Sequence, residues 1–286
     1  MDLDELLIHT TIRIEADFPN DLHGTGTGFF FTFFSNAQIQ VPCIVTNKHV
    51  VDGAKSLKLR FSLSVDGKLA NKQFTFELTD LENFIIYHPE KSVDLCIILI
   101  AELIKFFKDK KEKLFYTTLT ESDIPDEKYI QESVSNIEDI TVIGYPDGIW
   151  DCANNLPIVR KGITATSLKY EFENTSRFLI DSAIYGGSSG SPVYIYNQGA
   201  YSIKNTLYAG GRVKLVGIVY AVAQHKVNGE IKIVLAPAIN SKPITETNIP
   251  NNLGVVIKAK KILDFKEIIQ QRLLKDKLIP VDVKAE

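Results

Sequence analysis

The sequence has few cysteines: only Cys43, Cys96 and Cys152 among 286 residues. A small odd number without a Cys-x-x-Cys pair is not typical of a disulfide framework or a thiolate metal site. Cys43 and Cys96 also fall within apolar, strand-like runs. We therefore interpret all three as ordinary residues of a reduced protein, and we expect no metal and no cofactor.

Long hydrophobic runs and an excess of one charge are also missing. The densest apolar stretches, "LCIILIAEL" and "GFFFTFF", are far shorter than the ~20 residues that a membrane span needs. Lysine and arginine total 32 against 35 acidic residues, which gives a net charge of −3. We therefore expect no membrane span and no nucleic-acid partner.

The first residues, "MDLDELLIHT", lack the basic region and the small-residue cleavage site of a secretory signal. With so few cysteines, this start predicts a cytoplasmic protein. The hydrophobic fraction of 45% and the charged fraction of 23% are ordinary globular values, which exclude a disordered chain.

Most of the chain has the pattern of β-strands. Alternating or apolar runs such as "TTIRIEA" and "QFTFELT" follow one another at short intervals over about residues 10–105, separated by turn residues as in "SVDGK". Residues 106–138 differ, because helical spacing in "AELIKFFKDKKEKLF" leads into an acidic, loop-like stretch. Strands resume over 139–257, and 258–278 predict a closing helix. We expect a single all-β domain with two β-rich halves.

The run "YGGSSGSPVY", residues 185–194, contains three glycines and three serines. Strand-like segments flank it on both sides, which is unusual for a flexible linker. Glycines let a backbone turn sharply, so that amide N–H groups converge on one point beside a serine. A serine nucleophile would still need a neighbouring base and donors for the oxyanion.

A base and an acid for such a serine can be found in the first half. His49 lies at the end of the apolar strand "CIVTN", whereas the other four histidines lie in polar or loop-like settings. Asp94 immediately precedes the apolar run "LCIILI". Each alone is more often structural, but the order His, Asp, Ser is that of chymotrypsin and differs from subtilisin and the α/β-hydrolases.

Four segments, "GTGTGFFF", "CIVTNKHVV", "SVDLCIILI" and "DSAIYGGSSGSPVY", resemble the trypsin-like (chymotrypsin-fold) serine peptidases. The resemblance is to bacterial stand-alone types related to glutamyl endopeptidases and HtrA protease domains. It covers roughly residues 10–105 and 139–270. It implies two six-stranded antiparallel β-barrels, a partly helical connector and a C-terminal helix.

The same resemblance implies the catalytic residues. Ser189 fills the serine position of "G-x-S-G" and would be the nucleophile. His49 would be the general base and Asp94 would orient it. The backbone N–H groups of Gly187 and Ser189 would form the oxyanion hole.

The substrate pocket is likewise implied by the resemblance. Its base would be Ala183, six residues before the nucleophile, and its walls would be Ile184, Tyr185, Val219, Tyr220 and Ala221. Alanine supplies no charge, so we expect an apolar or small residue before the scissile bond. His225 lies where a histidine helps glutamyl endopeptidases bind glutamate, which leaves an acidic preference open.

The sequence thus predicts a serine endopeptidase that hydrolyses peptides or proteins through an acyl-enzyme. Two alternatives stay open. The chain could be a partner-activated protease of a bacterial defence or stress system that cuts one effector protein, since no signal and no PDZ domain are evident. It could also be a catalytically silent binding protein on a protease fold. Nucleotide binding is disfavoured, because the run "GTGTG" lacks the G-K-[ST] of a phosphate-binding loop.

Overall fold

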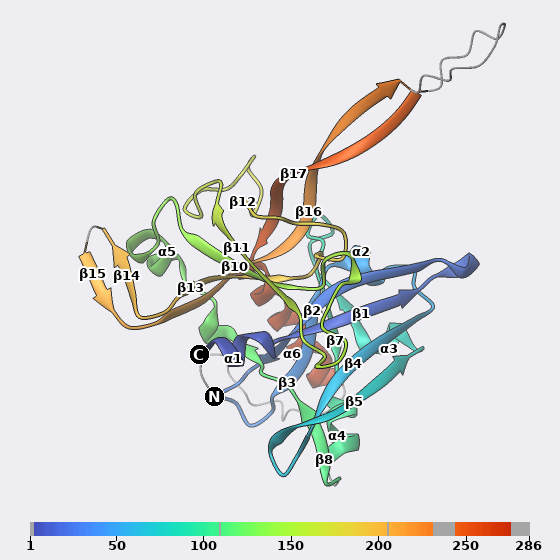
Figure 1. The fold of residues 1–286 in the computed structure, drawn as a ribbon. Helices are drawn as coiled ribbons and strands as arrows, with labels where there is room; N and C mark the ends of the chain where they lie inside the picture. Colours follow the sequence, from blue (N-terminus) through green and yellow to red (C-terminus); the bar gives the residue numbers. More distant parts are fainter. Residues whose placement is uncertain (1–2, 109, 205, 231–243, 276–286) are drawn as a thin grey trace, which may run out of the picture.

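The computed structural model describes residues 3–108, 110–204, 206–230 and 244–275, without the side chains of 108, 223–230 and 244–251. The strands of the first half form one nine-stranded sheet (Figure 1). Its hydrogen-bonded order is β5-β4-β1-β2-β3-β7-β6, with β8 paired to β4 and β9 paired to β2. The strands are β1 (Thr11–Asp17), β2 (His23–Phe33), β3 (Val41–Thr46), β4 (Ser56–Val65), β5 (Lys68–Leu78), β6 (Ile85–Tyr87), β7 (Cys96–Leu99), β8 (Glu112–Phe115) and β9 (Leu119–Thr120).

The second half closes into a six-stranded barrel with the order β10-β11-β12-β17-β16-β13. This closure confirms one of the two predicted barrels. Strands β14 and β15 form a separate two-stranded sheet, and the hairpin of β16 and β17 extends well beyond the barrel (Figure 1). The strands are β10 (Asp139–Gly144), β11 (Ile158–Thr164), β12 (Arg177–Asp181), β13 (Pro192–Asn197), β14 (Ala200–Ile203), β15 (Thr206–Ala209), β16 (Arg212–Glu230) and β17 (Ile244–Lys258).

Helices are short and lie between or after the strands. The described α-helices are α1 (Leu3–Ile8), α2 (Lys48–Val51), α3 (Leu81–Phe84), α4 (Ala101–Lys108), α5 (Glu127–Ser133) and α6 (Phe265–Lys275), and the 3-10 turns are η1 (Pro19–Asp21), η2 (Glu121–Asp123), η3 (Pro146–Gly148) and η4 (Ala259–Asp264). In the closing segment, Ile262, Phe265 and Ile269 are buried against the core, and Leu273 is partly buried there. No helix among the described residues is long and apolar enough to cross a bilayer.

The run "GFFFTF" in β2 is apolar on both faces because both faces are buried. Side chains alternate between the faces of a strand. Phe29, Phe31 and Phe33 therefore join one core cluster, whereas Phe30 joins another. The first cluster also holds residues of β13, β16 and α6, so it is the apolar interface between the two halves. A third cluster fills the barrel.

The prediction of a second closed barrel is not confirmed. Among the described strands, the sheet of the first half runs from β5 to β6 without a pairing that joins its ends. Helix α4 covers this side instead: Phe107 packs edge-to-face on Phe74 of β5, with 5.0 Å between ring centroids. A cavity of about 260 Å³ lies between α4 and strands β4, β5 and β7. The open side between the two ends of the sheet, which we call the seam, is thus covered by a helix and not closed by strand pairing.

The connector differs from the sequence prediction in two places. The helical spacing was expected to continue to residue 115, but the helix ends at Lys108 and Glu112–Phe115 pairs with β4 as β8. The acidic stretch predicted as a loop contains α5, whose N-cap Asp126 accepts a hydrogen bond from the Tyr129 N–H. Tertiary pairing decided the first case, and an unrecognised helix cap explains the second.

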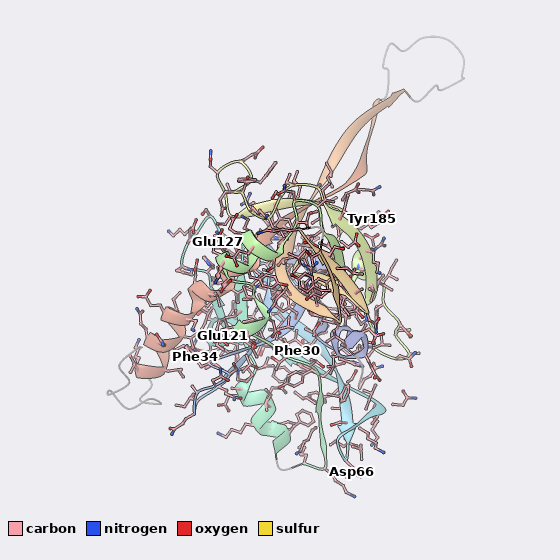
Figure 2. The ribbon with its side chains drawn as sticks, turned by 90° about the vertical axis from the view of Figure 1, so that its left-hand side faces the viewer. Phe30, Phe34, Asp66, Glu121, Glu127 and Tyr185 are labelled. Atoms are coloured by element: carbon pink, nitrogen blue, oxygen red, sulfur yellow. The ribbon has the colours of Figure 1, made fainter. Side chains whose placement is uncertain are left out.

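The predicted turn in "SVDGK" is a two-residue hairpin between β4 and β5. Asp66 and Gly67 both have positive φ, 52° and 78°, as a type I′ turn requires. Figure 2 shows Asp66 at the far end of this hairpin, remote from the centre of the molecule where Phe30 lies.

Candidate active site

A cleft of about 650 Å³ lies where the two halves meet. Two predicted site residues of the first half and three of the second half line it. Its lining is Lys48, His49, Asp52, Lys91, Ser92, Asp94, Ser189, Tyr220 and Ala221. The cleft therefore brings together His49, Asp94 and Ser189, which lie up to 140 residues apart in the sequence (189 − 49).

His49 is placed by the short helix that follows β3. The buried Asn47 precedes this helix, and its side-chain amide donates to the Asp94 carbonyl at 2.8 Å. The Lys48 N–H reaches the same carbonyl at 3.4 Å. These bonds hold the backbones of the two segments together without using the imidazole or the carboxylate.

The side chains of His49 and Asp94 then bond directly. One carboxylate oxygen, Oδ1, accepts from the His49 backbone N–H at 3.0 Å, and the other, Oδ2, contacts the ring Nδ1. The Asp94 side chain is 18% exposed and that of His49 is 48% exposed. A carboxylate at Nδ1 favours the tautomer with its proton there, so Nε2 is left as the proton acceptor.

Burial distinguishes the three serines of the turn between β12 and β13. Ser188 is 3% exposed and Ser191 is 1% exposed, whereas Ser189 is half-buried and lines the cleft. The Ser188 hydroxyl accepts a weak hydrogen bond from the Tyr185 N–H at 3.4 Å. Of the three hydroxyls, only that of Ser189 is thus accessible to a substrate.

Thr27 of β2 holds the serine turn in place from the opposite half. Its backbone N–H donates to the Ser189 carbonyl at 2.9 Å, and its hydroxyl donates to the Gly187 carbonyl at 3.0 Å. The same hydroxyl accepts from the Tyr145 N–H at 3.0 Å. The sequence prediction missed this role, although Thr27 lies inside the quoted "GTGTG" run.

Gly190 shows how closely the halves approach. Its φ of +87° is in the left-handed region, and a Cβ there would lie 1.9 Å from the Thr27 carbonyl oxygen. Only glycine satisfies both constraints. Its N–H donates to the Val219 carbonyl at 2.9 Å, which ties the turn to β16.

The backbone around Gly187 leaves two amide donors free. The Gly186 carbonyl accepts from the Asp147 N–H at 2.6 Å, and Thr27 holds the Gly187 carbonyl. In the described part of the chain, the N–H groups of Gly187 and Ser189 have no acceptor. Unpaired N–H groups beside an accessible hydroxyl can bind a developing oxyanion.

The described contacts include no direct hydrogen bond between Ser189 and His49. Such bonds are often long before a substrate is bound, so the shared cleft is the relevant observation. Burial raises the pKa of both the Cys43 and Cys96 thiols, which disfavours either of them as a competing nucleophile, and the exposed Cys152 does not line the cleft.

The predicted pocket residues have different environments. Tyr220 and Ala221 line the cleft, and Ala183 and Tyr185 are half-buried. Ile184 and Val219 are buried in the core of the barrel, so any contact with substrate would come from their backbone atoms. Only the backbone of His225 is described. The pocket assignment stays a prediction. The described residues contain no group of three or more potential ligands placed to hold a metal ion.

Comparison with known proteins places the chain in a family. The family described as "Trypsin-like peptidase domain" matches residues 26–200, a range that contains His49, Asp94 and Ser189. The chain belongs to this trypsin-like peptidase family. No curated protein matches the chain.

The solved structures that are similar to the chain include three proteases. The HtrA-type protease AlgW with a tripeptide is 14% identical, with a TM-score of 0.47 over 93% of this chain and 61% of that one. The Rv3671c protease from M. tuberculosis, in its active form, is 16% identical, with a TM-score of 0.44 over 92% and 84%. The serine endoprotease from Yersinia pestis is 14% identical, with a TM-score of 0.46 over 97% and 68%. The trypsin-like peptidase chain thus spans about three fifths of the AlgW chain.

Proposed function

We propose that this trypsin-like peptidase is a serine endopeptidase that uses Ser189, His49 and Asp94. The observation that supports this most is the cleft itself. It presents one accessible serine hydroxyl together with an imidazole whose Nδ1 is bonded to a carboxylate. The free N–H groups of Gly187 and Ser189 add the electrostatic part of the site.

The proposed reaction begins when Ser189 Oγ attacks the carbonyl carbon of the scissile peptide bond while His49 Nε2 takes the hydroxyl proton. Asp94 stabilises the imidazolium that forms, without itself becoming protonated. The negative charge on the substrate oxygen is bound by the Gly187 and Ser189 N–H groups. His49 then gives its proton to the amine as the C–N bond breaks, which leaves the acyl-enzyme. In the second half of the reaction a water molecule attacks the acyl carbon while His49 takes its proton. His49 returns that proton to Ser189 Oγ as the ester bond breaks.

We infer that the first half acts as the second barrel of this fold, with α4 in place of strand pairing at its seam. Support comes from its contribution to the cleft, since His49 and Asp94 come from the first half and Ser189 comes from the second. Substrate would lie between the halves, along β16, where Tyr220 and Ala221 meet the cleft.

A fluorophosphonate probe, which reacts only with an activated serine, tests this function. We expect the wild-type chain to be labelled and to cleave a peptide library, and Ser189→Ala to lose both, with turnover lower by about a million-fold. Ser188→Ala and Ser191→Ala are matched controls, because they remove neighbouring buried hydroxyls.

Two results would contradict the proposal. Labelling of Ser189→Ala as fast as wild type would show that another residue is the nucleophile. A folded wild-type chain that is neither labelled nor active on any peptide would favour a silent binding protein on this fold.

A further inference from the structure

Arg177, the first residue of β12, lies one aromatic ring away from the proposed general base. Its guanidinium carbon is 4.6 Å from the centroid of the Tyr220 ring. The same ring lies 6.2 Å from the imidazole of His49, with an angle of 75° between the ring planes. Tyr220 therefore separates the reacting centre from a cation that takes no part in the proposed reaction.

A β-bulge places Tyr220 in this position. Val219 pairs with Val256 and Ala221 pairs with Val255, so Tyr220 is the extra residue without a partner in β17. Bulges redirect a side chain and often occur next to active sites. Val219 remains in the core of the barrel, whereas the ring of Tyr220 reaches the cleft.

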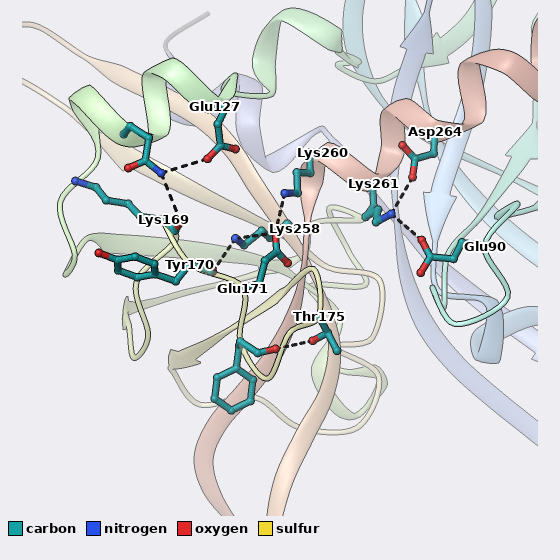
Figure 3. Close-up of polar contacts among 12 residues, drawn as sticks. Glu90, Glu127, Lys169, Tyr170, Glu171, Thr175, Lys258, Lys260, Lys261 and Asp264 are labelled. Atoms are coloured by element: carbon teal, nitrogen blue, oxygen red, sulfur yellow. Dashed lines mark hydrogen bonds and ion pairs between the residues drawn. The ribbon is translucent and has the colours of Figure 1, made fainter.

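Arg177 has no carboxylate partner among the described residues. Among the described residues, the one hydrogen bond of its side chain is a long bond of 3.5 Å from Nη2 to the Ser92 carbonyl. Figure 3 shows Glu171, Glu90 and Asp264 with their lysine partners. Glu171 binds Lys258 and Lys260, whereas Glu90 and Asp264 both bind Lys261. An anion is therefore the missing partner of Arg177.

Arg177 lines a cavity with room for such an anion. A cavity of about 380 Å³ is lined by Arg177 and by the uncharged polar residues Asn174, Thr175 and Ser176. Ser92 lines both this cavity and the active-site cleft, so the two spaces adjoin. The glutamates on the cavity wall, Glu90 and Glu171, are neutralised by the lysines named above.

We propose that Arg177 forms a subsite for an acidic side chain of the substrate, two to four residues before the scissile bond. This proposal rests on the proposed peptidase function. A substrate along β16 would pass Ser189 first and Tyr220 next, so Arg177 meets a residue removed from the reacting bond. A planar guanidinium stacked on an aromatic ring is well oriented for a two-point bond to a carboxylate.

The test uses quenched peptides that differ only by Glu or Gln at the second, third or fourth position before the scissile bond. We expect kcat/KM of the wild type to favour Glu at one of these positions by about tenfold, the value of one added charge-assisted bond. Arg177→Gln should abolish this preference, and Arg177→Glu should favour Lys at the same position. Added salt should weaken the wild-type preference.

Arg272→Gln is the matched control. It removes the same charge from α6, where the Arg272 side chain donates to the Asn83 carbonyl, and it should leave the preference unchanged. If Arg272→Gln lowers the preference as much as Arg177→Gln, the effect is one of net charge and the subsite is refuted.

A binding measurement separates the subsite from the chemistry. The Ser189→Ala variant should bind fluorescent Glu peptides about tenfold more tightly than Gln peptides, because the subsite needs no nucleophile. Glu-dependent binding without any cleavage by wild type would support the subsite and contradict the peptidase. Cleavage with equal rates for Glu and Gln at all three positions would do the opposite. Absence of both binding and cleavage would overturn the subsite as well.

Discussion

The two halves of the molecule build their parts of the cleft in different ways. The first half holds His49 and Asp94 by hydrogen bonds of its own, because Asn47, Lys48 and His49 all donate to Asp94 within that half. The second half presents Ser189 on a turn whose carbonyls are bound by Thr27 of the first half.

Because of this difference, a disturbed contact between the halves should affect the two parts of the site unequally. The pair of imidazole and carboxylate should keep its geometry as long as the first half folds. The serine turn instead depends on the contact between the halves, and a displacement of about 1 Å in a catalytic group can cost about a hundredfold in rate. The interface is therefore as much a part of the site as the residues that react.

Among the variants that keep the nucleophile and compare the two halves, the largest effect is expected in the first half. Asp94→Asn would remove the charge that stabilises the imidazolium and would favour the wrong tautomer of His49. We expect kcat for peptide hydrolysis to fall by about ten-thousandfold with the fold retained by circular dichroism. Asp52→Asn is the control, because Asp52 lines the same cleft but pairs with Lys48. A similar loss in both variants would mean that the general field of the cleft, and not the bond to His49, carries the effect.

The second prediction concerns glycines with the same backbone conformation in the two halves. Gly190→Ala would place a Cβ against the Thr27 carbonyl, so the serine turn must move, and we expect about a hundredfold lower kcat. Gly53 has a similar φ of +80°, but a Cβ there meets nothing within 4 Å. Gly53→Ala should cost only backbone strain, about 1 kcal/mol of stability, and leave kcat unchanged. Equal kcat values for the two variants would contradict the dependence on the interface.

The third prediction removes one hydroxyl at the interface. Thr27→Val keeps the shape of the side chain but leaves the half-buried Gly187 carbonyl and the buried Tyr145 N–H without their partner. We expect about tenfold lower kcat/KM and a loss of about 1–3 kcal/mol in the free energy of unfolding. Thr27→Ser, which restores the hydroxyl, should recover most of both.

Thr32→Val tests whether the position on β2 matters. Thr32 bonds to the Thr118 hydroxyl, and neither residue lines the cleft. This variant should lose stability without losing activity. If Thr32→Val lowers kcat/KM as much as Thr27→Val does, then both variants lose activity because β2 is destabilised, and not because Thr27 holds the serine turn.

Features that depend on short segments could be predicted from the sequence. The turn at Asp66 and Gly67 and the strand before His49 are local, and the family resemblance then supplied the roles of the site residues. The helix α5 was missed because its cap, Asp126, stood in a stretch whose acidic composition is also typical of loops.

Features that depend on distant contacts could not be predicted. Strand β8 has the apolar spacing of a helix and forms a strand because β4 offers it an edge. Closure of a barrel depends on which strands pair, and α4 replaced that pairing in one half only. The roles of Thr27 and Arg177 are set across the fold: Thr27 reaches Gly187, 160 residues away, and Arg177 reaches Tyr220 beside a bulge.

The smallest expected effect concerns the stability of the first half alone. In this half Asp17 binds the Lys58 ammonium at 2.9 Å and His23 at 2.7 Å, which lowers the pKa of its carboxyl from 3.8 to about 2. A lowered pKa means that the ionised group favours the folded state. Its contribution is therefore complete above about pH 4 and is lost as the pH falls from there towards 2.

Urea unfolding of wild type and Asp17→Asn at pH 7, 5 and 3 measures this contribution. The difference between their unfolding midpoints should be the same at pH 7 and 5 and smaller at pH 3. Because the Asp17 pair is open to solvent, added salt should reduce the difference as well. Asp66→Asn at the tip of the hairpin controls for the loss of a negative charge. A difference that stays constant down to pH 3 would show that Asp17 acts through packing and not through its charge.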